Sequence, residues 1–220
     1  LDSNTIGSFN TAIGHEALAG NTTGHNSIGI GKQSLYTKQS GNPSIAIGYQ
    51  ALYNQNTGGF VVAIGHEAAK AATSASTFVA IGYRSQKHST GSNNITVGGH
   101  TMENANSSGS YNTAMGMQAL ATHGAGNNNS CFGYQSGFDL TDGTGNSFFG
   151  HVAGANLTTS DYNTGFGQGT LHYGTTYTRA SAVGFNALHY NTADNNVALG
   201  YYALFANTTG TNNVAVGTYA

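Results

Sequence analysis

Charge is scarce in this chain. Only 6% of its 220 residues are Asp, Glu, Lys or Arg, and the formal net charge is −2, whereas about a quarter of the residues of a typical domain are charged. The six Lys and Arg residues form no basic stripe, which argues against a nucleic-acid partner. Asn, Ser, Thr, Gln and Tyr must therefore solvate the surface.

Other residue types and patterns are missing as well. Cys131 is the single cysteine, so no intrachain disulfide framework exists. The 33 glycines do not recur at every third position, which excludes collagen. The longest apolar runs, such as "FVVAIG" at 60–65, are too short to span a bilayer, so we expect no membrane insertion. Because the chain begins at Leu1 rather than Met, we expect 1–220 to be a single repeat domain within a longer fibrous chain.

What the chain does contain is a repeat. A glycine closes an "AIG"-like tripeptide at intervals of 17 residues, or in three cases 16 or 18. We call these residues the anchor glycines, and they cover the whole sequence: Gly14, Gly31, Gly48, Gly65, Gly82, Gly98, Gly116, Gly133, Gly150, Gly167, Gly184, Gly200 and Gly217.

The residues around the anchors form columns of similar chemistry. The residue before each anchor is large and apolar, as in Ile13, Phe149 and Val216, and we expect this column to be core. Two places earlier the residue is β-branched or Ser, and the residue between is usually small. Alternation with a period of two and β-branched enrichment predict a short strand before every anchor.

Three further columns complete the repeat. The third residue after the anchor is always Ala, Ser or Thr, which indicates either close approach of a neighbouring chain or a tight corner inside one chain. The fourth is mostly Leu and adds a second apolar contribution. Seven residues before most anchors another glycine, such as Gly24 or Gly126, indicates a turn with a positive φ.

A unit of 17 residues cannot enclose a core alone, but stacked units can bury a continuous one. The columns therefore predict an all-β fold: a parallel β-solenoid of about 13 coils with ~17-residue repeats. Helical repeats need longer units that are rich in Ala, Leu, Glu and Lys.

Strings such as "NTAIGHEAL" (10–18), "NTAMGMQAL" (112–120) and "NNVALGYYAL" (195–204) resemble the "SVAIGxxA" repeats of YadA-like trimeric autotransporter adhesin heads, and similar repeats of bacteriophage tail fibres. The resemblance covers essentially the whole chain. It implies a left-handed β-roll, three chains packed side by side as a homotrimer, and an extracellular place on a cell surface or virion tail fibre. The period here is longer than in that family, so each coil carries a longer loop.

Two columns are candidates for a specific role. Asn recurs four residues before the anchor, and stacked amides predict a structural ladder along the solenoid at Asn112, Asn129, Asn146, Asn163, Asn196 and Asn213. The position after the anchor repeatedly holds an aromatic residue, and we expect exposed rings that either cover the β-surface or bind glycans at Tyr49, Tyr83, Tyr134 and Tyr201.

Catalytic and metal sites are not expected. "HEALAG" at 15–20 lacks the second histidine of a zinc-protease helix, and "DLTDGTGN" at 139–146 lacks the ligand spacing of a calcium loop. Cys131 fills a small, buried position before Phe132, where an inert role is expected. We therefore expect no enzyme, no cofactor and no metal.

The functional prediction is a non-enzymatic extracellular fibre or adhesin segment that attaches to a host-surface glycan or protein receptor. Two alternatives stay open. One is a self-assembling structural filament subunit, because the chain begins and ends inside a repeat. The other is an ice-binding β-solenoid, which would need a flat ladder of Thr on a strand face.

Overall fold

A computed structural model describes residues 1–73, 77–104 and 107–220. The predicted all-β solenoid with a spacing of about 17 residues is confirmed. The described residues hold thirteen strands and no helix, and hence no helix that could cross a membrane. The strands are β1 Thr11–Ile13, β2 Ile28–Ile30, β3 Ser44–Ile47, β4 Val61–Ile64, β5 Phe78–Ile81, β6 Ile95–Val97, β7 Thr113–Met115, β8 Ser130–Phe132, β9 Ser147–Phe149, β10 Thr164–Phe166, β11 Ser181–Val183, β12 Val197–Leu199 and β13 Val214–Val216.

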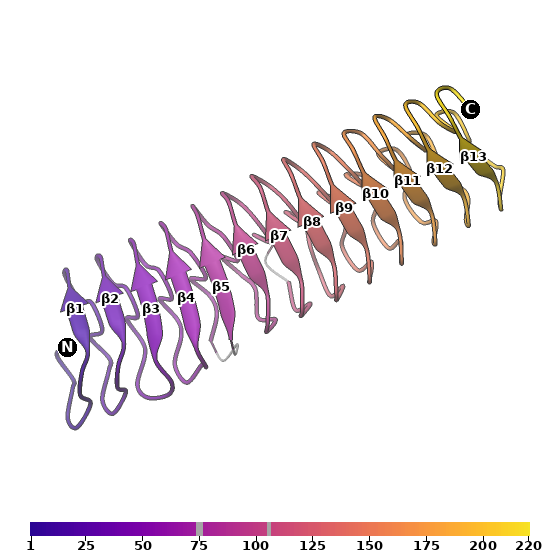
Figure 1. Cartoon of the computed structure of the whole chain (residues 1–220). Helices are drawn as coiled ribbons and strands as arrows, with labels where there is room; N and C mark the ends of the chain where they lie inside the picture. The colour runs from indigo at the N-terminus through magenta and orange to yellow at the C-terminus, as the bar shows by residue number, and fades with distance from the viewer. Residues whose placement is uncertain (74–76, 105–106) are drawn as a thin grey trace. The chain divides into compact units, whose positions relative to one another are not determined.

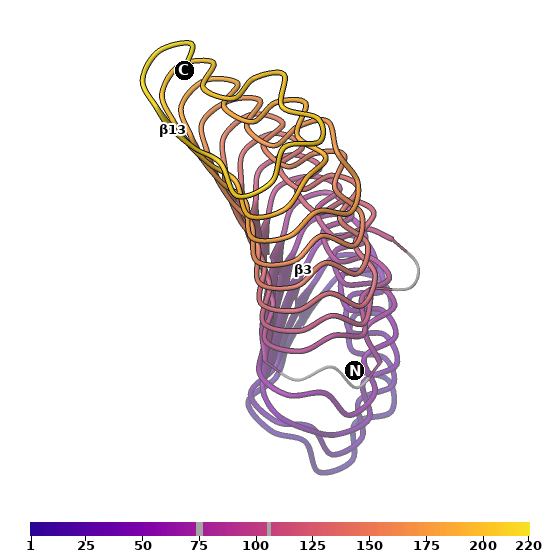
Figure 2. The same ribbon diagram turned by 90° about the vertical axis from the view of Figure 1, so that its right-hand side faces the viewer.

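The chain divides into two compact units. Unit 1, Leu1–Ser110, holds β1 to β6, and unit 2, Tyr111–Ala220, holds β7 to β13. Within each unit, every strand pairs in parallel with the strand of the next coil (Figure 1). The register joins equivalent repeat positions, as in Ile13 with Ile30 and Leu199 with Val216. Figure 2 shows the coils of unit 2 nested behind one another with similar outlines.

The prediction that the large residue before each anchor is core is wrong. The residue two places before the anchor points inward, as Ala46, Ala114 and Cys131 do, and these three are fully buried. It is small in most strands, but in β9 it is the fully buried Phe148. Since successive side chains of a strand point to opposite faces, the flanking large residues lie outside. Phe166 is 51% exposed and Val216 67% exposed. Pattern alone identified the alternation but assigned its two faces the wrong way round.

The interior is built from other columns. Most leucines four residues after the anchor are fully buried, including Leu18, Leu52 and Leu188, whereas Leu204 is partly buried. Apart from Ala220, the small residues three after the anchor are equally buried inside their own coil, as are Ala51 and Ser136. Their small size therefore follows from the tight corner inside one chain, the second of the two predicted explanations, and does not indicate a neighbouring chain.

The seventh residue after the anchor also points inward, a column that the sequence analysis missed because its chemistry varies. It places Lys38, His123 and Leu140 in the interior, all fully buried. Lys38 Nζ donates to the backbone oxygen of Asn42 at 2.9 Å, and no carboxylate neutralises its charge in the described structure. Burial lowers the pKa of the Lys38 ammonium from 10.5 to about 8.

The anchors must be glycine for two reasons. Their φ values lie between 122° and 144°, where a side chain is strained. In addition, most anchors stack on the anchor of the next coil, so that a methyl group at Gly65 would meet the carbonyl carbon of Gly82 at 2.6 Å.

The glycines seven residues before the anchors have a different role from the predicted one. Gly41 has a positive φ, but Gly24 and Gly126 do not. Gly126 is needed instead because a side chain there would meet the backbone carbonyl carbon of Asp142 at 3.1 Å and approach the oxygen of Gly143 still more closely. Close stacking of coils, rather than turn conformation, selects glycine at that position.

Candidate functional site

The outward sides of the strands form an extensive uncharged surface on each unit, mostly apolar in unit 1 and mixed with Ser and Thr in unit 2, which we call the strand face. It consists of the residues three places and one place before each anchor, and none of them is charged. In unit 1 these are Thr11, Ile13, Ile28, Ile30, Ile45, Ile47, Val62, Ile64, Val79, Ile81, Ile95 and Val97. In unit 2 they are Thr113, Met115, Ser130, Phe132, Ser147, Phe149, Thr164, Phe166, Ser181, Val183, Val197, Leu199, Val214 and Val216.

The two strand faces differ in shape. In unit 2, Phe132, Phe149 and Phe166 stack on one another with ring centroids 4.7 and 4.5 Å apart. In unit 1 an open hollow of about 490 Å³ runs beside the aliphatic rows, bordered by Pro43 and Phe60. The strand face thus has protruding stacked rings in unit 2 and a hollow in unit 1, and neither face carries a charged residue.

The four predicted tyrosines are exposed, from 39% for Tyr49 to 45% for Tyr201. They are not isolated rings. His66 lies between Tyr49 and Tyr83, with ring centroids 4.9 and 5.3 Å away, and His151 stacks on Tyr134 at 5.3 Å. Histidines thus continue the tyrosine ladder. Their place directly after an anchor glycine, the same position as the tyrosines, is visible in the sequence.

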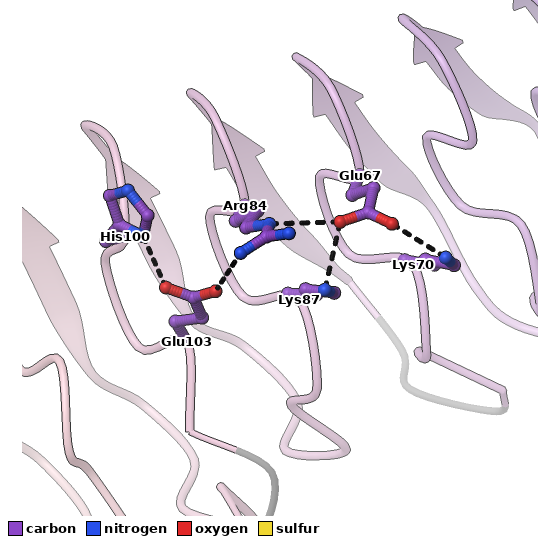
Figure 3. Close-up of polar contacts among 6 residues, drawn as sticks. All are labelled: Glu67, Lys70, Arg84, Lys87, His100 and Glu103. Carbon is purple, nitrogen blue, oxygen red and sulfur yellow. Dashed lines mark hydrogen bonds and ion pairs between the residues drawn. The ribbon is translucent and has the colours of Figure 1, made fainter.

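A charged network borders this ladder in unit 1 (Figure 3). Glu67, only 7% exposed, accepts from Lys70 at 2.7 Å, Lys87 at 2.9 Å and Arg84 at 3.0 Å. Arg84 also reaches Glu103 at 3.6 Å. Hydrogen bonding from Lys70, followed by contacts with Lys87, lowers the pKa of Glu67 from 4.5 to about 2 despite its burial.

This network ties three successive coils together, and its charges are satisfied by one another. Glu103 also contacts the ring of His100, which packs edge-on against Tyr83 at 5.0 Å. The guanidinium of Arg84 lies 5.1 Å from the centroid of the Tyr83 ring. The network therefore holds the ladder in place rather than offering free charge to a ligand.

Further ring ladders follow the fifth and sixth residues after the anchor, which the sequence analysis did not single out. Tyr36 stacks on Tyr53 at 5.0 Å in unit 1. In unit 2, His172, His189 and Phe205 stack at 5.2 Å per step, and Tyr173 stacks on Tyr190 at 5.1 Å. Alignment on the anchors places these rings in common columns, so the signal was present in the repeat.

The asparagine column forms hydrogen bonds from coil to coil. The side-chain amide of Asn129 donates to Oδ1 of Asn112, Asn146 to Asn129, and Asn163 to Asn146, each at 3.1 Å. Asn213 donates to Asn196 at the same distance. Ala180 occupies the asparagine position between Asn163 and Asn196, so the side-chain ladder is interrupted there. The backbone N–H of Ala180 donates to Asn163 Oδ1 at 2.9 Å.

Reactive chemistry is confined to buried or dispersed groups. No cluster of three His, Cys, Asp or Glu side chains that could hold a metal occurs among residues 1–73, 77–104 and 107–220. Cys131 is fully buried, and burial raises the pKa of its thiol to about 12, so it stays protonated and unreactive at neutral pH.

Comparison of the chain with protein-family models, curated proteins and solved structures gives no match. The resemblance to adhesin-head and tail-fibre repeats therefore stays a prediction from the repeat itself.

Proposed function

We propose that the chain is a non-enzymatic extracellular fibre or adhesin segment, of a bacterial surface or a phage tail fibre, that attaches to a cell-surface glycan. The observation that carries this proposal is the set of exposed aromatic ladders on an almost uncharged solenoid. Tyr rings offer an apolar face to the C–H groups of a sugar and a polar hydroxyl to its edge. The proposal involves no cofactor, metal or nucleic acid.

A binding measurement on the purified chain tests the attachment function. The chain is applied to an array of neutral and acidic oligosaccharides and to intact bacterial and animal cells, at low and high salt. We expect binding to a subset of glycans that changes little with salt, because few charges contribute. Absence of binding to every glycan and cell type would overturn the attachment function and leave a spacer role.

We further propose that copies of this chain cover the strand face, as a homotrimer. Exposed apolar patches larger than a few hundred Å² usually mark interfaces. A second copy is the fitting occupant because the face carries no charge, so that two such faces meet without desolvating an ion. Equivalent side chains recur at the same inter-strand spacing in every copy, so the rows of two copies match along their length. A neighbour's side chains would also fill the hollow beside Pro43 and Phe60.

The same face favours the second candidate function, a self-assembling structural filament. Electron microscopy of the isolated chain separates the two, because a filament subunit forms open-ended polymers whereas an adhesin head stays a closed, small assembly. Ice binding has less support, because most outward strand positions of unit 1 are Ile or Val rather than Thr.

A further inference from the structure

In unit 2, the residues six places after successive anchors include two stacked aromatic rings that no third ring continues. Tyr173 and Tyr190 lie on successive coils with their rings nearly parallel, at an interplanar angle of 14°. The next residue of the column is Ala206, which is exposed. The parallel stack therefore ends at Tyr190, because Ala206 supplies no ring to continue it and Phe205 of the same coil stands perpendicular to Tyr190.

The ring of Tyr190 is firmly positioned although it is 42% exposed. Tyr173 covers one of its faces, and the rings of His189 and Phe205 stand perpendicular to it at 4.7 and 5.1 Å. Its backbone N–H donates to the oxygen of Phe205 at 3.0 Å. A ligand ring that stacks here would lose little entropy in ordering the protein.

An open hollow of about 410 Å³ lies beside Tyr173, Tyr190 and Ala206. Besides the two tyrosines and Ala206, Thr175, Thr192 and Thr208 line it. A second hollow of about 450 Å³ shares Thr192 and Thr208 and adds further threonines and Asp194. Threonine hydroxyls both donate and accept, which is what sugar hydroxyls require. The hydroxyl of Thr192 already donates to the backbone oxygen of Thr208 and is left to accept.

We propose that this hollow binds one ring of a neutral oligosaccharide, stacked on the open face of Tyr190 above Ala206, with the next sugar along the shared threonines. The inference rests on the proposed attachment function and assigns its site. The hollow is built from Tyr, Gly, Thr and Ala, so no cation is placed to select an anionic sugar. In the ladder of Tyr49, His66 and Tyr83, by contrast, neighbouring rings stack on both faces of His66.

The sharpest variant is Ala206→Tyr, which would continue the column and occupy the place of the sugar. We expect the variant to fold, since rings already stack at this position in the two preceding coils. A neutral oligosaccharide that binds the wild-type chain on the array should bind A206Y at least tenfold more weakly. Tyr190→Ala, which removes the platform, should lose binding to the same extent, and Tyr190→Phe should keep most of it.

Tyr162→Ala is the control, because Tyr162 is an exposed tyrosine of unit 2 that lies outside the ring ladders described above. We expect it to bind as the wild-type chain does, with circular dichroism confirming the fold of every variant. If the wild-type chain binds a glycan and folded A206Y and Y190A bind it equally well, the site is wrong while the attachment function stands. If the wild-type chain binds no glycan, both fail.

Discussion

Most anchor positions have room for a hydrogen atom and nothing larger. At Gly65 the φ of 134° strains any side chain, and the backbone of Gly82 lies in its path. We expect Gly65→Ala to lower the free energy of unfolding by about 3 kcal/mol, because backbone strain and overpacking add. Urea unfolding measures this change.

Gly99→Ala serves as its control. Gly99 has no positive φ, and an added methyl group would come no closer than 3.9 Å, to the oxygen of Tyr83. Its free energy of unfolding should stay within about 0.5 kcal/mol of the wild-type value. Equal losses in the two variants would contradict the stacking explanation.

Lys38 carries a buried charge without a carboxylate partner. Its pKa is about 8 in the folded chain and 10.5 when unfolded, so the unfolded state binds more protons between these values and stability should rise with pH from about 8 to 10.5. Lys38→Leu should abolish this rise. It should also stabilise the chain at pH 7 by about 1 to 3 kcal/mol, since the desolvation penalty disappears.

Leu140 shows that leucine fits this inward column. Urea unfolding of wild type and K38L at pH 7, 9 and 10.5 checks the prediction. A wild-type stability that stays flat or falls over this range would show that the ammonium is solvated or paired in the folded chain.

The asparagine ladder acts between elements. Asn146 donates to Asn129 and to the backbone oxygen of Ser160, and it accepts from the backbone and side chain of Asn163. Asn146→Ala should therefore cost about 3 kcal/mol, because it removes these bonds and leaves buried partners unsatisfied.

Asn213→Ala gives a graded comparison, because Asn213 is only partly buried and donates to Asn196 alone in the ladder. We expect a loss of about 1 kcal/mol from it. If thermal unfolding gives the same change for both variants, the ladder does not contribute cooperatively to coil stacking.

Glu67 links coils through charge. Because its pKa is about 2 when folded and 4.5 when unfolded, its contribution is full above pH 4.5 and is lost as the pH falls toward 2. Glu67→Gln should cost up to about 3 kcal/mol at pH 7 and much less at pH 2.5. Glu16→Gln is the control, since Glu16 accepts from the Gln33 amide rather than from three cations, and it should cost about 0.5 kcal/mol at most.

The repeat determined the elements of this fold but not which side of each strand faces inward. The anchors give every strand and its register, because glycine is the only residue that fits between stacked coils. The alternation of Ile45, Ala46 and Ile47 does not by itself say which side of the strand faces the interior. Hydrophobicity predicted that the isoleucines point inward, whereas Ala46 does. The narrow interior selects a small residue in most strands, with Phe148 of β9 as the exception, and composition does not express this packing constraint.

The candidate site was predictable to the same degree. Exposed tyrosines after the anchor follow from the repeat, as Tyr49 and Tyr83 show. The hollow at Tyr190 could not be predicted in the same way. It arises because Ala206 replaces a ring in the column, and only the three-dimensional path of the loops shows that the lining residues lie together.

At the scale of the whole molecule, our central proposal is that copies of this chain pack together through the strand face. Its outward rows are uncharged in both units. They are mostly apolar in unit 1, and in unit 2 one row is apolar whereas the other is mostly Ser and Thr. Leu199 and Val216 remain exposed in the single chain. Such a surface is stable in water when another apolar surface covers it.

The most direct test is sedimentation equilibrium of the wild-type chain and of Phe149→Lys, with Ala125→Lys as the control at an exposed position outside the strand face. We predict three times the 22.5 kDa chain mass for the wild type and for A125K, and a monomer for F149K, because a lysine among the stacked phenylalanines cannot be buried without a partner. A wild-type chain that sediments as a single 22.5 kDa species at all concentrations would contradict the claim.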